Sequence, residues 1–140
     1  MLNQEIHFLL LKCFHYSNKM IVQKTSELGL YPGQPKILEC LLEKDGQTPK
    51  EIGKTCVLDK STMTILLQKM EKQGLIYRKS HHHDKRSIQI FLTDSGHKLA
   101  LKVKQICYEA DSIAYQSLKK EEVNDLLNQI IQNFQEAYHE

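Results

Sequence analysis

Glycine is scarce in this sequence, with six residues in 140, and the motifs of common enzyme sites are missing. There is no glycine-rich phosphate-binding loop and no His-Glu-x-x-His motif, so the sequence does not indicate an enzyme, and we expect no cofactor. No window approaches about 18 uninterrupted apolar residues, as a membrane-spanning helix would require. The apolar run from Phe8 to Phe14 is short, is interrupted by Lys12 and has no basic leader, which argues against a signal peptide. We therefore expect a cytoplasmic protein that contacts no membrane.

The spacing of metal ligands is missing as well. The four cysteines, Cys13, Cys40, Cys56 and Cys107, are not paired at the short intervals of a zinc site, and each lies on or beside an apolar segment. In a cytoplasmic protein this pattern predicts buried, reduced thiols. The run His81-His82-His83 could bind a metal in principle, but three successive side chains in a loop point in different directions. We therefore expect no metal site.

The composition is that of an ordinary globular domain, with 41% apolar and 26% charged residues, and the length fits one domain. The net charge of +2 conceals an uneven distribution. Between Lys44 and Lys104 there are 13 Lys and Arg against 6 Asp and Glu, a net charge of +7, whereas the rest of the chain carries −5. Such a basic segment is typical of proteins that bind the phosphates of nucleic acid, although a solvated basic face has the same composition.

Two helices separated by a short turn are predicted within this basic segment. Thr48-Pro49-Lys50-Glu51 has the form of a capping box, in which the first and last residues satisfy each other's backbone donors. The proline occupies the first position of a short helix from Pro49 to about Thr55. Cys56-Val57-Leu58 follows, and Asp59 is a suitable N-cap for a second helix that Gly74 ends. The arrangement predicts a helix-turn-helix.

The second of these helices has two different faces. Met63, Leu66, Leu67 and Met70 recur at helical spacing and form one apolar stripe, which predicts a buried back. The other sides carry mostly short polar and cationic residues, namely Lys60, Ser61, Thr62, Thr64, Ile65, Gln68 and Lys69. The pattern therefore predicts a helix with a polar and cationic front.

Two antiparallel strands are predicted after this helix. The segments Leu75 to Lys79 and Ser87 to Leu92 are rich in β-branched and aromatic residues, and apolar residues alternate with others in the second segment. The link from Ser80 to Arg86 is polar and charged. A hairpin loop of that length would project from the domain as a wing.

Apolar helices are predicted on both sides of this region. The first spans Asn3 to about Gly29, and after Pro35 the next spans Lys36 to Lys44. Beyond the strands, Thr93 caps a helix, and a break at Ser117 to Lys120 precedes a final helix. These helices have more apolar surface than so small a core needs, so we expect burial against a second copy of the chain. Their apolar side chains include Leu99, Val103, Ile106, Ala110 and Ile113, and then Val123, Leu126, Leu127, Ile130, Ile131, Phe134 and Tyr138.

Four segments together resemble the MarR family of bacterial regulators. They are Leu58 to Thr64, Met70 to Ile76, Asp84 to Ser87 and Leu92 to Gly96, and they occur in the family's order with similar gaps. The Asp-x-Arg of the wing followed by Leu-Thr-x-x-Gly is the more specific part of the match. The resemblance covers essentially the whole chain.

The resemblance implies a mainly α fold with a small β-hairpin wing. A winged helix-turn-helix at residues 31–93 would be flanked by dimerisation helices at residues 1–30 and 94–140. The implied function is that of a dimeric, sequence-specific DNA-binding transcription regulator, acting as a repressor. Its partners would be double-stranded DNA at a pseudo-palindromic operator and a second copy of the chain, and a small molecule or an oxidant would release it.

The front of the second helix would then read bases in the major groove. Gln68 can pair with adenine, and Ile65 can pack on a thymine methyl group. Lys50, Lys69 and Lys79 are the expected contacts to the phosphate backbone. The candidate base-reading residues are Lys60, Ser61, Thr62, Thr64, Ile65 and Gln68.

The wing would reach the minor groove. In the family a wing arginine enters that groove, and Arg86 matches it, with Asp84 placed to brace its guanidinium group. An ordinary surface Asp-Arg pair is the alternative. Residues His81 to His83 would line the DNA as protonatable groups or remain solvated.

The family also binds small aromatic or phenolic effectors between its dimerisation and DNA-binding parts, and some members sense oxidants through a cysteine in the first helix. His7, Cys13, His15 and Tyr16 are the candidates here, although the spacing from Cys13 to Tyr31-Pro32 differs from that of the oxidant-sensing branch. Core or surface histidines are the alternative to an effector site.

A winged-helix module that binds another protein, without DNA, is the alternative function. The charge asymmetry, the wing arginine and the front rich in Ser, Thr and Lys argue against this alternative. The sequence identifies neither the operator, the regulated genes nor the effector.

Overall fold

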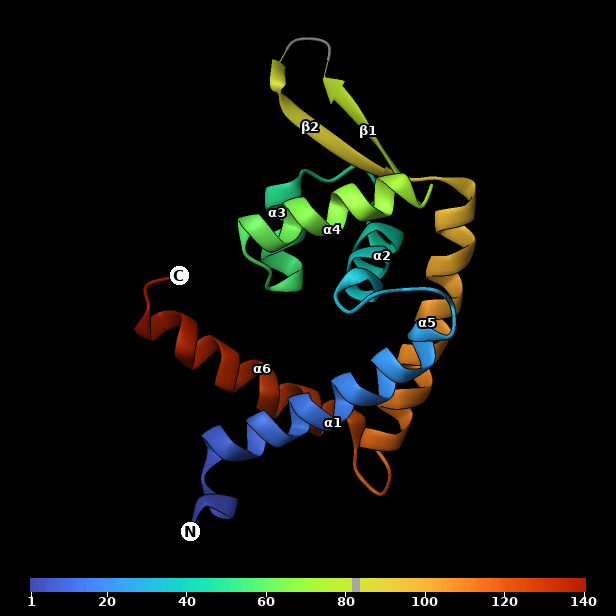
Figure 1. Ribbon diagram of the computed structural model, residues 1–140. Helices are drawn as coiled ribbons and strands as arrows, with labels where there is room; N and C mark the ends of the chain where they lie inside the picture. The colour runs from blue at the N-terminus through green and yellow to red at the C-terminus, as the bar shows by residue number, and fades with distance from the viewer. Residues whose placement is uncertain (82–83) are drawn as a thin grey trace. The chain divides into compact units, whose positions relative to one another are not determined.

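The computed structural model describes residues 1–81 and 84–140, and for residues 81 and 84–86 only the backbone (Figure 1). The described chain is mainly α-helical with one antiparallel hairpin, which confirms the predicted fold class. It forms two compact units, Met1–Cys107 and Tyr108–Glu140. Its elements are the 3-10 helix η1 (Leu2–Gln4), α1 (Ile6–Ser26), α2 (Gln34–Glu43), α3 (Pro49–Cys56), α4 (Lys60–Lys72), β1 (Ile76–His81), β2 (Asp84–Leu92), α5 (Asp94–Ala114) and α6 (Lys120–Ala137).

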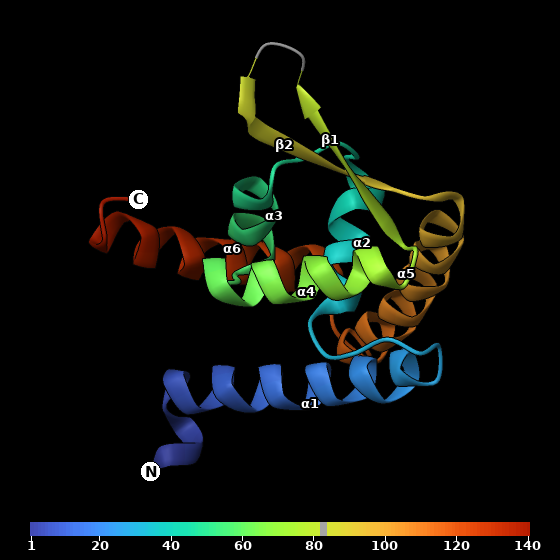
Figure 2. The same ribbon diagram turned by 45° about the horizontal axis from the view of Figure 1, so that its top comes forward.

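One apolar core holds the first unit together. Burial of a large apolar side chain stabilises a fold by about 1.5–3 kcal/mol, so this core is the main source of stability in the unit. In Figures 1 and 2, α3 and α4 lie next to each other and the hairpin projects beyond them. The core therefore fixes α4 on one side and leaves its other side exposed. Its largest buried side chains are Ile37, Leu38, Leu41, Ile52, Leu67, Met70, Ile76, Ile90 and Val103.

The turn between α3 and α4 is tight because Val57 adopts a left-handed conformation, with φ 55° and ψ 51°. The next amide, of Leu58, donates a hydrogen bond of 2.9 Å to the carbonyl of Gly53 and so ends α3. At the start of α3, the hydroxyl of Thr48 accepts from the amide of Glu51 at 3.2 Å, as a capping box requires. The second hydrogen bond of the capping box differs from the prediction. The Glu51 carboxylate was expected to accept from the backbone amide of Thr48, but it accepts from the Thr48 hydroxyl at 3.1 Å.

The hairpin is longer than predicted. The predicted strands stopped at Lys79 and resumed at Ser87, whereas β1 continues to His81 and β2 begins at Asp84, with an irregularity in register next to Ser80. The predicted extent of the loop is therefore wrong. Polar residues can continue a two-stranded ladder because backbone hydrogen bonds hold it, and the alternation of apolar residues does not reveal such a segment.

The base of the hairpin is tied to the loop between α2 and α3. The amide of Gly46 donates to the carbonyl of Ile90 at 2.9 Å, and the amide of Ile90 donates to the carbonyl of Gln47 at 2.8 Å. The carboxylate of Asp45 accepts from the amide of Leu92 at 2.9 Å. These bonds hold the wing in one orientation relative to the helices of the first unit.

Two helices begin elsewhere than predicted. The first was predicted from Asn3, but α1 begins at Ile6, because an extended residue separates it from η1. The helix expected from Lys36 begins at Gln34. Its second residue is Pro35, and proline is tolerated there because the amides of a first helical turn have no acceptor within the helix.

Apolar side chains remain exposed on the helices near both ends of the chain. In the first unit these lie on α1, and in the second unit they lie on α6, which follows a turn with Ser117 at φ 65°. Contiguous exposed apolar surface marks a site of interaction with another molecule. The exposed side chains are Ile6, Leu9, Leu11, Phe14 and Tyr16 on α1, and Leu126, Leu127, Ile131 and Phe134 on α6.

Candidate nucleic-acid interface

The two faces predicted for α4 are confirmed by their burial. Met63, Leu66, Leu67 and Met70 are buried in the core of the first unit. On the remaining surface, Thr62 is half-buried, and the apolar Ile65 is 54% exposed. Lys60, Ser61, Thr64, Gln68 and Lys69 are exposed. The helix therefore presents a polar and cationic surface on a rigid apolar support.

The first turn of α4 is closed by Asp59, as predicted. Its carboxylate accepts from the amide of Thr62 at 2.7 Å and from the hydroxyl of Ser61 at 2.9 Å. These two hydrogen bonds hold the pKa of Asp59 below its ordinary value, because they favour the charged carboxylate. The hydroxyl of Thr64 donates to the carbonyl of Lys60 at 2.9 Å. Two of the predicted base-reading hydroxyls thus already use their protons within α4.

Two cationic side chains at the far end of α4 are held by neighbours. The ammonium group of Lys69 lies 5.0 Å from the centre of the Tyr31 ring, a cation–π contact. Arg78 of β1 forms an ion pair with Glu71, with Nε and Oε2 2.6 Å apart. The prediction from sequence included Lys69 but missed Arg78, whose position seven residues after Glu71 does not by itself indicate contact.

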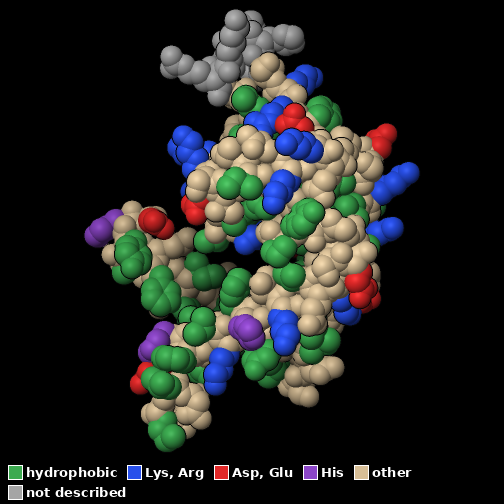
Figure 3. Space-filling model, in the orientation of Figure 1, with side chains coloured by type: hydrophobic (Ala, Val, Ile, Leu, Met, Phe, Trp, Pro, Cys, Tyr) green, Lys and Arg blue, Asp and Glu red, His purple; other side chains and the backbone are tan. Residues whose placement is uncertain are grey.

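Further lysines border α4. Lys50 on α3 and Lys79 on β1 are exposed. Lys54 is exposed as well, and it was not among the predicted DNA contacts although it lies one helical turn after Lys50. Figure 3 shows Lys and Arg side chains over this face of the first unit. A groove of about 640 Å³ runs between α3 and α4, and its lining includes Lys50, Lys54 and Lys60 above apolar Leu58 and Met63.

The wing residues Asp84 and Arg86 belong to β2, but their side chains lie outside the described residues. The side chains of His81 to His83 also lie outside them. Among the described residues, no three His, Cys, Asp or Glu side chains gather where they could hold a metal ion. No helix in the described part of the chain is long and apolar enough to cross a membrane.

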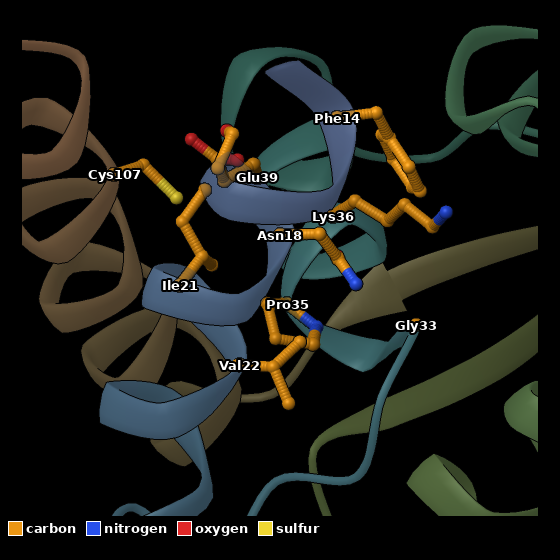
Figure 4. Close-up of a pocket in the computed structure, with 10 residues that line it drawn as sticks. Phe14, Asn18, Ile21, Val22, Gly33, Pro35, Lys36, Glu39 and Cys107 are labelled. Carbon is orange, nitrogen blue, oxygen red and sulfur yellow. The ribbon is translucent and has the colours of Figure 1, made fainter. Parts of the chain in front are cut away.

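The proposed effector residues on α1, namely His7, Cys13, His15 and Tyr16, are all exposed in the single chain. A cavity of about 190 Å³ opens nearby between α1 and α2 (Figure 4), and none of these four residues lines it. Its lining is formed by Phe14, Ser17, Asn18, Ile21, Val22, Gly33, Pro35, Lys36, Glu39 and Cys107.

The cysteines differ in burial. Cys40, Cys56 and Cys107 are buried as predicted, but Cys13 is exposed, because α1 leaves that side uncovered in the single chain. Burial raises the pKa of Cys56 to about 12, with a further contribution from the neighbouring thiol of Cys40. Cys56 is therefore a neutral thiol at physiological pH.

Residues 30–88 of the chain match the MarR family. The organic hydroperoxide resistance transcriptional regulator of Bacillus subtilis is 35% identical over 95 residues, which cover 68% of this chain and 65% of that protein. The HTH-type transcriptional regulator SarZ of Staphylococcus haemolyticus is 36% identical over 92 residues, which cover 64% of this chain and 63% of SarZ. The matched part is thus slightly less than two thirds of either relative. Among solved structures, MepR of Staphylococcus aureus in complex with DNA has a TM-score of 0.82 at 25% identity, covering 94% of this chain and 98% of MepR.

Proposed function

Because the chain belongs to the MarR family of transcription regulators, we propose that it is a DNA-binding transcription regulator, with α4 as its recognition helix. The observation that carries the proposal is the outward face of α4, on which Lys60, Gln68 and Lys69 are exposed above a buried apolar stripe. Cationic groups suit phosphates, and a carboxamide suits the edge of a base. The structure of MepR with DNA, from a relative with the same fold, supports this assignment.

Some side chains of the recognition helix and its neighbours would contact bases, and others would contact phosphates. Gln68 would pair with adenine, and Ile65 would pack on a thymine methyl group in the major groove. Lys50, Lys69 and Lys79 would contact phosphates, because they are exposed lysines on α3, α4 and β1 respectively. The remaining base-reading candidates are Lys60, Ser61, Thr62 and Thr64.

The wing would add a contact in the minor groove. Arg86 would enter where the groove is narrow and its potential most negative, and Asp84 would brace the guanidinium group. The hydrogen bonds from the base of the hairpin to Asp45 and Gln47 support this role, because they hold the wing to the unit that contains α4.

The functional form would be an obligate homodimer. Residues 1–30 and 94–140 would form the dimer, and residues 31–93 would bind DNA, because α1 and α6 leave apolar side chains exposed in the single chain. Two copies related by a two-fold axis would place their recognition helices in successive major grooves, about 34–36 Å apart. The operator would then be a pseudo-palindrome. Light scattering should give the mass of a dimer at micromolar concentration, and a stable monomer would contradict the assembly.

The protein would act in the cytoplasm as a repressor that a chemical signal releases from its operator. The cavity between α1 and α2 would bind a small aromatic or phenolic effector, and the exposed Cys13 would be the target of an oxidant. The name of the B. subtilis relative, which refers to organic hydroperoxide resistance, supports an oxidant as the signal. A reporter gene behind the operator should be silenced by the protein and restored by the signal.

The first experiment is a gel shift with the DNA upstream of the protein's own gene. Lys60→Ala and Gln68→Ala should weaken binding, whereas Lys19→Ala, which removes an exposed lysine on α1, should not. If each dimer neutralises about six phosphates, affinity should fall about 10³-fold between 50 and 200 mM salt. An affinity that salt does not change would favour the alternative, a winged-helix module that binds another protein.

A further inference from the structure

A buried glutamine joins the start of α2 to the end of α4. Gln34 is fully buried, and its side-chain oxygen accepts from the amide of Tyr31 at 3.1 Å. Its side-chain nitrogen donates to the side-chain oxygen of Gln73 at 2.8 Å, and Gln73 in turn donates to the carbonyl of Gly29 at 3.4 Å. Burying a carboxamide costs free energy unless its hydrogen bonds are made, so the folded state favours the bond between Gln34 and Gln73.

Two more contacts bind the same loop to the recognition helix. The ring of Tyr31 lies under the ammonium group of Lys69. Gly33 has φ 91° and lies so close to α4 that a Cβ atom there would be 2.9 Å from Cδ1 of Leu66. Residues 66, 69 and 73 recur at helical spacing, so the loop between α1 and α2 follows one side of α4 along its second half.

The end of this loop and the start of α2 form part of the cavity wall. Gly33, Pro35 and Lys36 line the cavity together with residues of α1, including Phe14 and Val22 (Figure 4). Gln34 therefore lies between cavity-lining neighbours in sequence while its side chain bonds to the end of α4. A displacement of the cavity wall would therefore be passed to α4 through the bond between Gln34 and Gln73.

We propose that Gln34 is a positioning residue for DNA recognition, and that its bond to Gln73 couples the α1–α2 loop to the direction of α4. The proposal rests on DNA binding by α4, as proposed above. Gln34 is fully buried and cannot touch DNA, so it acts through the helix. The bond fixes the last turn of α4 and thereby the placement of Gln68 and Lys69 against the groove. Movement of the cavity wall that breaks the bond lowers affinity without altering any residue that contacts DNA.

The test uses the full chain in four variants: Gln34→Leu, Gln73→Leu, the double variant, and Thr25→Val as a control. Thr25 is also buried, and among the described residues its hydroxyl donates to carbonyls of α1, that of Ile21 at 2.8 Å and that of Val22 at 3.4 Å. Hydrogen exchange followed by mass spectrometry should show severalfold faster exchange at residues 66–75 in Gln34→Leu and Gln73→Leu, and no change there in the control. This readout does not depend on DNA.

Operator affinity, measured by fluorescence anisotropy at one salt concentration, provides the second readout. Gln34→Leu should weaken binding about five- to tenfold, the effect of one hydrogen bond, while Thr25→Val should leave it unchanged. The double variant should lose less than the sum of the two single losses, because both changes remove the bond between Gln34 and Gln73 and each also removes one bond of its own, to the Tyr31 amide or to the Gly29 carbonyl. Gln73→Leu alters an exposed position and supplies the same test should Gln34→Leu fail to fold.

Two results would overturn the coupling: wild-type exchange at residues 66–75 in folded Gln34→Leu protein, or a loss of affinity in the double variant that equals the full sum of the two single losses. If the wild-type chain binds no DNA while exchange responds as expected, the connection from Gln34 to α4 stands and the function proposed for α4 fails. The two failures are therefore distinguishable.

Discussion

Replacement of Gly96 by alanine should destabilise this protein, although the same change inside an ordinary helix is stabilising by about 0.5–1 kcal/mol. Gly96 lies in the first turn of α5, against the backbone that leads into β1. A Cβ atom added there would lie 1.9 Å from the carbonyl oxygen of Leu75, and contacts under 3.0 Å essentially never occur. Because the obstacle is backbone, the start of α5 would have to move.

The expected magnitude follows from the bonds that such a movement would break. The amide of Thr93 donates to the Leu75 carbonyl at 3.1 Å, and the hydroxyls of Thr93 and Ser95 both donate to the Gly74 carbonyl, at 2.6 and 3.0 Å. Each hydrogen bond contributes about 1 kcal/mol net to stability. After the gain in helix propensity is subtracted, Gly96→Ala should lower the free energy of unfolding by about 2–2.5 kcal/mol.

Thermal unfolding followed by circular dichroism, at one protein concentration, measures this loss. The Tm should fall by about 5–15 °C. Gly53→Ala is the matched control, because it is also a helical glycine, and the nearest atom to its Cβ would be the Leu58 carbonyl oxygen at 3.1 Å. That variant should change the Tm by only a few degrees. An unchanged or raised Tm in Gly96→Ala would refute the close approach of α5 to Leu75.

Three other outcomes are expected. Arg86→Ala should leave the protein folded but weaken binding to the proposed operator about tenfold or more, or about 1.4 kcal/mol, most strongly with A·T-rich flanks. Asp84→Ala should do so more mildly. Anisotropy titrations at one salt concentration, with thermal melts alongside, check both, and wild-type affinity in folded Arg86→Ala protein would remove the wing from the mechanism. Burial raises the pKa of Cys56 from 9.0 to about 12, so as pH rises this thiol ionises first in the unfolded state, and the stability of the fold should decrease through this range. Urea titrations should show a smaller decrease in Cys56→Ala. The Thr62 amide lowers the pKa of Asp59, so the stability that this cap contributes should persist at neutral pH and be lost as pH falls below the ordinary carboxyl range. In an acid titration, the Asp59→Asn variant should not show this loss.

The helix-turn-helix could be predicted from sequence because its signals are local. Asp59 and Thr48 bond to amides three residues ahead, and Thr93 accepts from the amide of Gly96 at 3.0 Å in the same way. A short spacing of this kind is visible in the sequence itself. The apolar stripe of α4 is likewise a repeat within a few turns, and its burial agrees with the prediction.

The contacts that orient α4 could not be predicted in this way. Gln34 and Gln73 are 39 residues apart, and nothing in their own neighbourhoods indicates that one is buried or that the two meet. The same holds for Tyr31 and Lys69, which meet only because the loop after α1 passes beside α4. Exposure of Cys13 also escaped prediction, because an apolar neighbourhood in sequence does not say whether the single chain covers it.

The hydrogen bonds within α4 also bear on which of its residues can distinguish one operator from another. The hydroxyl protons of Ser61 and Thr64 are used by Asp59 and by the carbonyl of Lys60, so in the proposed complex both hydroxyls would meet DNA mainly as acceptors. An adenine presents both a donor and an acceptor in the major groove, and a carboxamide can satisfy both at once. Gln68 has that group on an exposed side chain, one helical turn beyond Thr64. Sequence discrimination should therefore depend more on Gln68 than on the hydroxyls of the first turn.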